Sequence, residues 1–449
     1  MIGKKAYSLA KQLWPINRSI TGEGVRQTLK IIKTIIPDLK IFEVKSGTKA
    51  FDWEVPLEWS VKDAWIKDPS GEKICEFKKN NLHLVGYSTP IHRMLSKNEL
   101  LKNLHSIPSM PNAIPYITSY YKKNWGFCIS EKQKKKLKKG QYEVFIDSKL
   151  FKGSLTYGEL LIKGQSKKEI FLSTYICHPS MANDQISGIC VTTFLSDWIL
   201  KYSNRKYSYR IIFIPETIGS IVYLSKNLIK MKKNILAGFN ITCVGDEKNY
   251  SYLPSKNGNT ISDSISKHVI QHIDSNYLHF NWSDRGSDER QYCSPNIDLP
   301  VASLMRSKYN YYKEYHTSLD NLKNVVTPKG LQGGYDLIRL AIQALEKNCY
   351  PKTKIYGEPF MSKRNFFPDI KKLSHKDKTS AKGGRRHYSN IKDKDEYYHL
   401  SMDIISLSDG KNSLLDIANF CKVPIWNLYP IVDILYKNKI IYLLKDPKK

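Results

Sequence analysis

From about residue 150 onward, apolar runs of strand length alternate with longer segments of helical period, and this alternation limits the fold more than any other feature. The expected strands are 168–177, 207–215, 234–244 and 299–305. The expected helices are 188–202, 219–231, 262–273 and 329–347. Strands and helices that alternate in this way form a largely parallel sheet with helices on both faces. The sequence therefore predicts an α/β fold with a mostly parallel sheet flanked by helices.

The remaining segments have a different character. Residues 46–150 are rich in Trp, Pro and Tyr and hold short extended runs with little helical period. They predict a β-rich domain inserted into an α/β domain made of residues 1–45 and 151–352. Residues 353–449 begin with a Lys-, Pro- and Ser-rich stretch that is typical of a linker, and they end in two short helical segments and a strand. That ending is the pattern of a winged helix-turn-helix.

The composition, with 41% hydrophobic residues, is typical of a globular protein. No apolar run approaches the ~18 residues of a membrane span, and the first residues lack the apolar core of a signal peptide. We therefore expect a cytoplasmic protein with no membrane association. Eight cysteines without a CxxC pair are expected to be reduced, buried thiols.

The formal net charge of +29 raises the question of a nucleic-acid partner. Most of the excess is lysine spread along the chain, with dense runs at 132–139 and 371–387. Lysine together with abundant Ile, Asn and Tyr is also what an AT-rich coding sequence produces. We therefore do not expect nucleic acid as the partner. A small-molecule or peptide-like substrate is expected instead, and assembly into a homo-oligomer stays open.

Side chains that bind metals follow the expected strands. They lie in four loops, "CHPSMAND" (177–184), "PETIGS" (215–220), "CVGDE" (243–247) and "EYHTSLDN" (314–321). Ligands of such sheets bind beyond the carboxyl ends of the strands. A zinc hydrolase needs imidazole and carboxylate ligands that converge there, with a free carboxylate as the base. His178 and His316 could supply nitrogens, Asp184 could bridge two metals, and Glu216 is the best-placed general base.

Each of these residues also has a structural interpretation. His178 stands before Pro179 and could close a strand, and Asp184 could cap the helix expected at 188–202. Glu216 could pair with a lysine, and Asp246 after a glycine fits an ordinary turn. Taken one at a time, these residues leave both interpretations open.

The order "CHPSMANDQISG … PETIGS … SDERQY … EYHTSLDN" resembles the zinc aminopeptidase superfamily. More closely, the chain resembles the aminopeptidase-like family often labelled polysaccharide biosynthesis proteins with an aminopeptidase-like domain. "WPINRSITGEGVRQTL" and "IPYITSYYKKNWGFCIS" also match the pattern of that family. The resemblance covers essentially the whole chain, including the β-rich insertion and the C-terminal winged helix.

The resemblance implies zinc, as one or two ions, with His178, Asp184 and His316 as ligands. It also implies a Glu-Glu pair in the second loop, where this chain has Glu216 followed by threonine. In one register Glu216 is the base and a ligand is missing, and in the other Glu216 is the ligand. The third loop should carry an Asp where this chain has a threonine, and Asp246 is the substitute. A single-metal site is therefore expected.

The loop "RGSDERQY" lies near substrate in this resemblance. Asp288 and Glu289 could hold a substrate amine, and Arg290 could hold an anion. A solvated charged turn explains the three residues equally well.

The leading hypothesis is a zinc-dependent hydrolase of an amide bond, either aminopeptidase-like or a deacylase, in surface-polysaccharide metabolism. In the alternative, the hydrolase fold is catalytically degenerate and the protein binds nucleic acid or protein through its winged helix. The segment expected to read DNA, 423–437, is apolar and carries Lys437 as its one cation. DNA-reading helices usually show several basic and amide side chains, and this difference favours the hydrolase.

Overall fold

A computed structural model describes residues 1–364, Tyr388 and residues 394–446. The chain divides into two units, residues 1–264 with 276–339 and residues 265–275 with 340–449, which are described separately. Most of the expected linker and the basic run at 371–387 lie outside the described residues.

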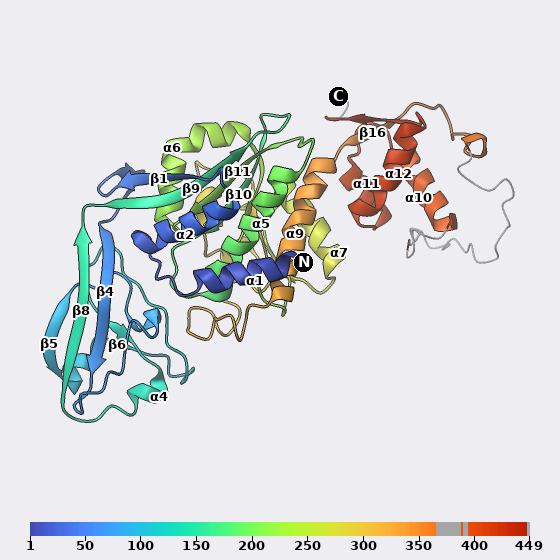
Figure 1. Ribbon diagram of the computed structural model, residues 1–449. Coiled ribbons are helices and arrows are strands. Elements are labelled where there is room, and N and C mark those ends of the chain that lie inside the picture. The colour runs from blue at the N-terminus through green and yellow to red at the C-terminus, as the bar shows by residue number, and fades with distance from the viewer. Residues whose placement is uncertain (365–387, 389–393, 447–449) are drawn as a thin grey trace. The chain divides into compact units, whose positions relative to one another are not determined.

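The first unit is built on an eight-stranded sheet in the order β1-β9-β11-β10-β12-β15-β13-β14 (Figure 1). The strands are β1 (Lys40–Lys45), β9 (Ser154–Ile162), β10 (Glu169–Tyr175), β11 (Ser208–Ile214), β12 (Ile235–Asn240), β13 (Ser251–Leu253), β14 (Leu278–His279) and β15 (Val301–Met305). The four central strands β11, β10, β12 and β15 are parallel. β9 and β1 continue the sheet antiparallel on one side, and β13 does so on the other. The predicted α/β fold is confirmed, with antiparallel strands added beside its parallel centre.

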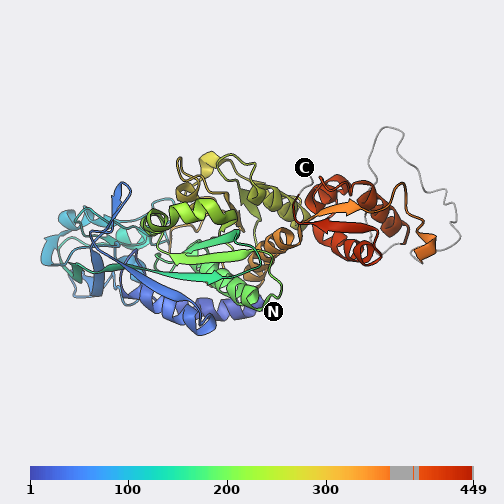
Figure 2. The same cartoon turned by 90° about the horizontal axis from the view of Figure 1, so that it is seen from above.

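Helices cover both faces of this sheet. The helices of this unit are α1 (Ile2–Leu13), α2 (Glu23–Ile35), α5 (Ser187–Lys201), α6 (Ile218–Asn234), α8 (Glu289–Tyr292) and the first part of α9 (Pro328–Lys347). Most of α7 (Ile261–Ile273) and the end of α9 belong to the second unit. Figure 2 shows the blue helices α1 and α2 on one side of the sheet and α6 on the other. Every residue of β10 is buried, because a central parallel strand is covered on both faces. This burial explains why its sequence shows no alternation of apolar and exposed polar residues.

Two glycines of α9 let this helix lie against the loop that follows β12. A Cβ atom on Gly330 would stand 2.0 Å from the carbonyl oxygen of Gly245. A Cβ atom on Gly334 would stand 2.1 Å from the carbonyl oxygen of Val244. Any larger side chain would therefore push the helix away from the loop that carries Asp246.

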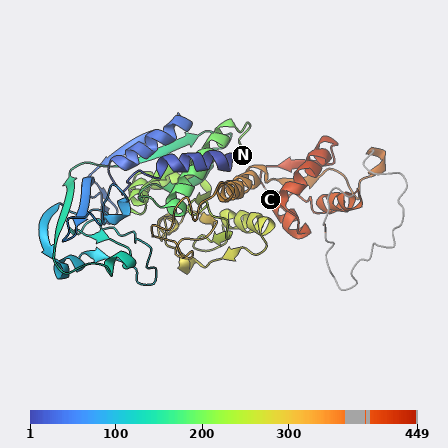
Figure 3. The same ribbon diagram turned by 60° about the horizontal axis from the view of Figure 1, so that its bottom comes forward.

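The β-rich segment leaves the large sheet after β1 and returns at β9. These two strands are neighbours, and Lys45 pairs with Ser154. The segment contains a three-stranded sheet in the order β4 (Glu58–Lys67), β8 (Gln141–Phe151) and β5 (Ile91–Ser96). Two further sheets have two strands each, β2 (Lys49–Ala50) with β3 (Trp53–Glu54) and β6 (Leu104–His105) with β7 (Phe127–Cys128). Its two short helices are α3 (Lys97–Leu101) and α4 (Glu131–Lys134). Figure 3 shows this blue and cyan segment at one end of the α/β part of the unit. One apolar core, which includes Trp59 and Ile212, runs through both parts.

The second unit has the elements of a winged helix. Its helices are α10 (Lys394–Ser406), α11 (Leu414–Cys421) and α12 (Ile425–Lys437), and β16 (Tyr350–Thr353) pairs antiparallel with β17 (Ile441–Leu444). A capping box of Ser413 and Asp416 fixes the start of α11. The helices α11 and α12 with the short turn between them, and the terminal strand β17, match the pattern expected from the sequence, whereas β16 was not expected. Four short helical turns complete the described chain, η1 (Asn81–His83), η2 (Ala182–Ile186), η3 (Trp282–Asp284) and η4 (Ser362–Arg364).

None of the eight cysteines forms a disulfide, and seven of them are buried. Within the described ranges, every helix is too short or too polar to traverse a lipid bilayer.

A buried arginine ties three strands together at the amino end of the sheet. Arg210 on β11 is 1% exposed, and its Nε and Nη2 donate to Glu169 on β10 at 2.6 and 3.1 Å. Its Nη1 donates to Glu159 on β9 at 3.0 Å and to the hydroxyl of Tyr223 at 2.7 Å. The ends of the β9, β10 and β11 strands therefore share one network of charged hydrogen bonds.

Replacing Arg210 by methionine would leave both carboxylates in place without their partner. We expect Arg210→Met to lower the free energy of unfolding by about 3–5 kcal/mol, because uncompensated buried charges are costly. Urea denaturation followed by tryptophan fluorescence measures the change. The same substitution at Arg93, which is exposed on β5, should change the free energy by less than about 0.5 kcal/mol. Equal losses in the two variants would contradict the structural role of this network.

Candidate metal centre

Three loops meet at the carboxyl edge of the parallel strands. His178 follows β10, Glu216 follows β11, and His316 lies in the long loop after β15. Asp184 belongs to the short turn η2 that connects β10 to α5. The structure thus brings together side chains that are far apart in the sequence, as expected for the shared edge of a parallel sheet.

His178, Asp184 and His316 form a compact group in which the ligand-type atoms all lie within 4.8 Å of one another. Oδ2 of Asp184 lies 3.9 Å from Nε2 of His178 and 3.0 Å from Nε2 of His316. This oxygen is buried and has no hydrogen bond of good geometry, although it is so close to His316. Two imidazole nitrogens and an unsatisfied carboxylate oxygen facing one another are a donor set that fits zinc.

The carboxylate of Asp184 is oriented by its second oxygen and by its own backbone. The hydroxyl of Tyr175, at the end of β10, donates to Oδ1. The backbone N–H groups of Asn183 and Asp184 donate to the two carboxylate oxygens of Asp320 at 2.8 and 3.0 Å. The hydroxyl of Tyr312 donates to Asp320 as well, at 2.8 Å. Asp320 therefore holds the turn that presents Asp184, and the sequence analysis did not single it out.

The peptide groups of His178 are held by two buried side chains. Gln185 accepts a hydrogen bond from the backbone N–H of His178 and donates to its carbonyl oxygen, the latter at 2.8 Å. Arg18 also donates to this carbonyl oxygen, at 2.9 Å. Gln185 has φ of 126°, a backbone conformation that L-residues seldom adopt and that these two bonds hold in place. The imidazole ring is thus fixed through its backbone.

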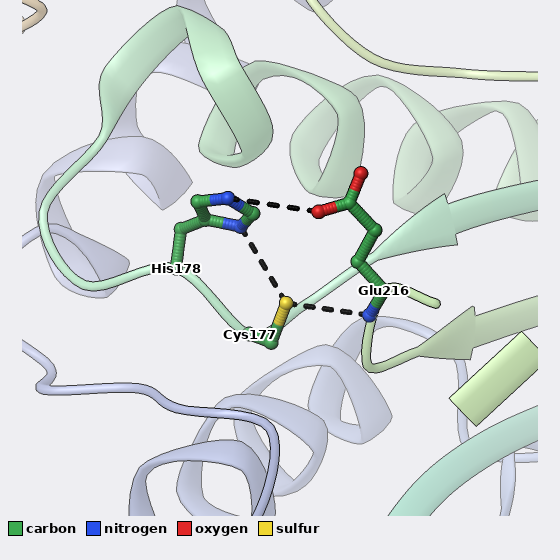
Figure 4. Close-up of side chains that lie close together, drawn as sticks. All are labelled: Cys177, His178 and Glu216. Atoms are coloured by element: carbon green, nitrogen blue, oxygen red, sulfur yellow. Dashed lines mark hydrogen bonds and ion pairs between the residues drawn. The ribbon is translucent and has the colours of Figure 1, made fainter. Parts of the chain in front are cut away.

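Glu216 lies beside His178 (Figure 4) and faces the same ring nitrogen as Asp184. Its Oε2 is 3.8 Å from Nε2 of His178, and its backbone N–H donates to Sγ of Cys177 at 3.3 Å. The same sulfur lies 3.5 Å from Nδ1 of His178. The carboxyl of Glu216 is 20% exposed, whereas His178 and Asp184 are 6% and 1% exposed. Glu216 is therefore the carboxylate beside the cluster that an incoming molecule can reach.

His316 is held between two tyrosines, one of which comes from the β-rich segment. The ring of Tyr315 stacks on His316 with centroids 3.9 Å apart. Tyr116 meets His316 edge-on at 5.1 Å and lies 5.0 Å from the ring of His178. The N–H of Tyr116 donates to the carbonyl oxygen of His316 at 2.8 Å. The sequence analysis quoted the segment of Tyr116 without giving the residue a role, because only the folded chain brings it to the histidines.

Burial shapes the titration of the group. It lowers the pKa of His178 to about 4, against the opposing charge of Asp184. Burial raises the pKa of Glu216 well above its usual value, and the charges of Asp288 and Asp184 raise it further. For Asp184 burial is outweighed by His178, His316 and the Tyr175 hydroxyl, so its pKa is lowered. A neutral imidazole beside an ionised carboxylate is the form in which both bind a metal.

Asp246 does not lie in this group. Its carboxylate accepts hydrogen bonds from Nδ2 of Asn183 at 2.9 Å and from the N–H of Lys248 at 2.9 Å. The N–H and the hydroxyl of Ser307 donate to it at 2.8 and 2.7 Å. With four donors on its two oxygens, Asp246 braces the loops around the cluster and is not directed into it.

The three residues of the "SDER" loop have different environments. Asp288 is fully buried and accepts a hydrogen bond from the N–H of Thr217 at 2.8 Å. Burial raises its pKa to about 7. Arg290 is exposed and donates to the hydroxyl of Thr217 at 2.8 Å. Glu289 is fully buried and accepts hydrogen bonds from Gly286, Ser287, Tyr309 and Asn240. Of the three, Arg290 alone faces solvent.

Comparison with known proteins covers nearly the whole chain. Residues 7–348 match the family described as a domain of unknown function (DUF4910), and residues 348–442 match a winged helix-turn-helix family. A Clostridium acetobutylicum protein, provisionally named a polysaccharide biosynthesis protein with aminopeptidase-like domain, is 44% identical over 443 residues, 98% of this chain and 97% of that protein.

Two solved structures are also similar. One is the 2.37 Å crystal structure of a provisionally named peptidase from Clostridium acetobutylicum, with a TM-score of 0.88, 43% identity, and coverage of 98% of this chain and 96% of that one. The other is a zinc aminopeptidase from Bacillus subtilis, with a TM-score of 0.55, 14% identity, and coverage of 76% and 94%. The second likeness shows the fold alone. The chain therefore has an aminopeptidase-like α/β fold followed by a winged helix, and it belongs to the DUF4910 family.

Proposed function

We propose that this protein is a metal-dependent hydrolase of an amide bond, with one zinc ion held by His178, Asp184 and His316. The observation that carries the proposal is the unsatisfied Oδ2 of Asp184, buried between the two imidazole rings. Catalytic zinc sites commonly use three protein ligands and leave a position open. The activity would be aminopeptidase-like or that of a deacylase, in surface-polysaccharide metabolism. The name of the Clostridium relative supports the aminopeptidase-like alternative and a link to polysaccharide biosynthesis.

Zinc bound there would polarise an amide carbonyl and acidify a water molecule. Glu216 is outside the three-ligand group, lies next to His178 and is partly exposed. We therefore assign it the role of general base, which takes the proton of the attacking water and returns it to the leaving amine nitrogen. Arg290, exposed and anchored to Thr217, would face an anionic part of the substrate.

The winged helix supports the alternative, nucleic-acid binding, less well than the metal centre supports a hydrolase. The exposed side chains of α12 include Asp433, Ile434, Tyr436 and Lys437, with one basic residue and one acidic residue among them. A helix that reads base edges usually presents several donors and acceptors. The described part of this unit thus gives no support to nucleic-acid binding, and we propose that it serves packing or self-association.

The metal content of the purified protein tests the proposed ligands. We expect about one zinc per chain in the native protein. His178→Ala and His316→Ala should lose it, because each removes one of only three donors. Asp246→Asn should retain it, because the Asp246 carboxylate faces other loops. Elemental analysis after dialysis against dilute zinc measures all four proteins. No zinc in the native protein, or its loss in Asp246→Asn, would contradict this ligand set.

The role of Glu216 is tested separately. Glu216→Gln should bind zinc as the native protein does and lower turnover by about 10²–10⁴-fold, the usual contribution of a positioned base. Turnover is measured over a panel of aminoacyl anilides and N-acetylated amino sugars. Unchanged turnover in this variant would exclude Glu216 as the base, and lost zinc would make it a ligand.

Asp320 is expected to act through the turn that carries Asp184. Asp320→Asn keeps only one carbonyl oxygen as an acceptor, so one of its two backbone hydrogen bonds is lost. Because residues that orient metal ligands typically contribute 10–100-fold to affinity, we expect zinc binding to weaken by about that factor. Competition with a zinc chelator measures it. Asp197→Asn on α5, a partly exposed control, should leave the affinity unchanged.

A further inference from the structure

A pocket of about 260 Å³ lies within the first unit, on the β-rich segment. Most of its lining comes from the turn between β1 and β2, from residues 54–57 at and after the end of β3, from the segment 120–123, and from the end of β8 and the residues after it. The lining residues include Glu54, Tyr87, Tyr120, Tyr121, Lys122, Lys123 and Lys152. Its volume is slightly below the range usual for drug-sized ligands, which indicates a small ligand or one group of a larger one.

The pocket is positively charged. Lys122, Lys123 and Lys152 are all exposed, and none of them forms an ion pair with another residue of the described chain. Glu54 is the one acidic residue in the lining, set against three lysines. Ammonium groups gathered around a recess attract and hold anionic oxygens such as those of phosphate and carboxylate.

The wall beside the lysines is aromatic and held in place by the core. The ring of Tyr87 stacks on buried Trp59 with centroids 5.7 Å apart, and Tyr120 packs edge-on against Tyr87 at 5.9 Å. The hydroxyl of Tyr121 donates to the carbonyl oxygen of Glu54 at 2.6 Å. Rigid aromatic faces next to cations suit a ligand that has an anionic group on a ring.

The same chain segment joins this pocket to the candidate metal centre. Tyr116, whose ring touches both histidines, is four residues before Tyr120. Between them, Gly86 and Ile117 are hydrogen-bonded at 3.0 Å, so the segment is tied to the residue next to Tyr87. The contact with the histidines and part of the pocket lining therefore belong to one continuous segment, residues 116–123.

We propose that this pocket binds an anionic group of the substrate, a phosphate or a carboxylate, while the amide bond to be cleaved lies at the histidines. The β-rich segment then supplies the specificity of the enzyme, and its substrates are acidic conjugates. The claim that the bound anion is part of a substrate rests on the proposed hydrolase function, whereas anion binding itself can be tested without catalysis.

The test measures binding of glucose 1-phosphate, glucuronate and glucose by calorimetry at low ionic strength. The protein is the full chain treated with a chelator, so that the result does not depend on zinc. We expect saturable binding of at least one of the two anions and none of glucose. The preferred anion identifies the group that the pocket takes.

Two triple variants locate the site. Lys122→Gln, Lys123→Gln and Lys152→Gln together should weaken anion binding at least about tenfold, since each exposed charge contributes modestly. The matched control is Lys226→Gln, Lys230→Gln and Lys233→Gln, which removes the same charge from a second surface hollow on and beside α6 and should change affinity less than about twofold. Glu54→Gln should strengthen binding, because it removes the one opposing charge.

Equal loss in both triple variants would mean that net charge alone attracts the anion and would overturn the proposal. Anion binding no tighter than that of glucose would overturn it as well. A protein that binds no zinc but shows the expected anion binding would disprove the hydrolase and leave the anion site in place.

Discussion

The hydrogen bonds from the backbone of Asn183 and Asp184 to Asp320 are the interaction on which the candidate metal centre depends. They join the turn after β10 to the loop after β15, so that Asp184 and His316 face each other. A buried carboxyl group that accepts two backbone N–H groups is a directional partner for the turn. Without it, Asp184 would lie in a turn with no regular structure of its own, since Gln185 has a strained backbone.

The β-rich segment is part of the site and not only an addition to the fold. It leaves and re-enters the sheet between paired neighbours, so it can be inserted without disturbing the parallel strands. Its residues 114–118 then run beside the loop of His316, where Ile114 and Ser318 exchange hydrogen bonds of 2.9 and 3.0 Å. The β-rich segment thus contacts the aminopeptidase-like part at the candidate site. It carries Tyr116, which contacts the histidines, and the pocket lined by the lysines.

Periodicity in the sequence was sufficient to find the central strands and the helices between them, because both faces of a parallel sheet are apolar. The same rule placed His178, Glu216 and Asp246 beyond the strand ends, and the structure binds the Asp246 carboxylate to other loops. His316 lies in a longer loop and was expected from its residue type and from the family resemblance. β1 and β9 were not expected, since nothing local distinguishes an antiparallel addition. Asp320 and Tyr116 act through contacts with residues more than a hundred positions away, and no spacing pattern records such contacts.

The proposed single metal ion agrees with the residues that stand in place of the missing carboxylates. Thr242 donates to the hydroxyl of Tyr175 at 2.6 Å, and that hydroxyl donates to Oδ1 of Asp184. In the proposed site Asp184 therefore has one oxygen committed to a hydrogen bond and one left for a metal. Thr217, where the resemblance implies a second glutamate, is held by Asp288 through its N–H and by Arg290 through its hydroxyl. Thr242 thus helps to orient Asp184 through Tyr175, and Thr217 ties the residue after Glu216 to the loop of Asp288, which suits the proposed one-metal hydrolase.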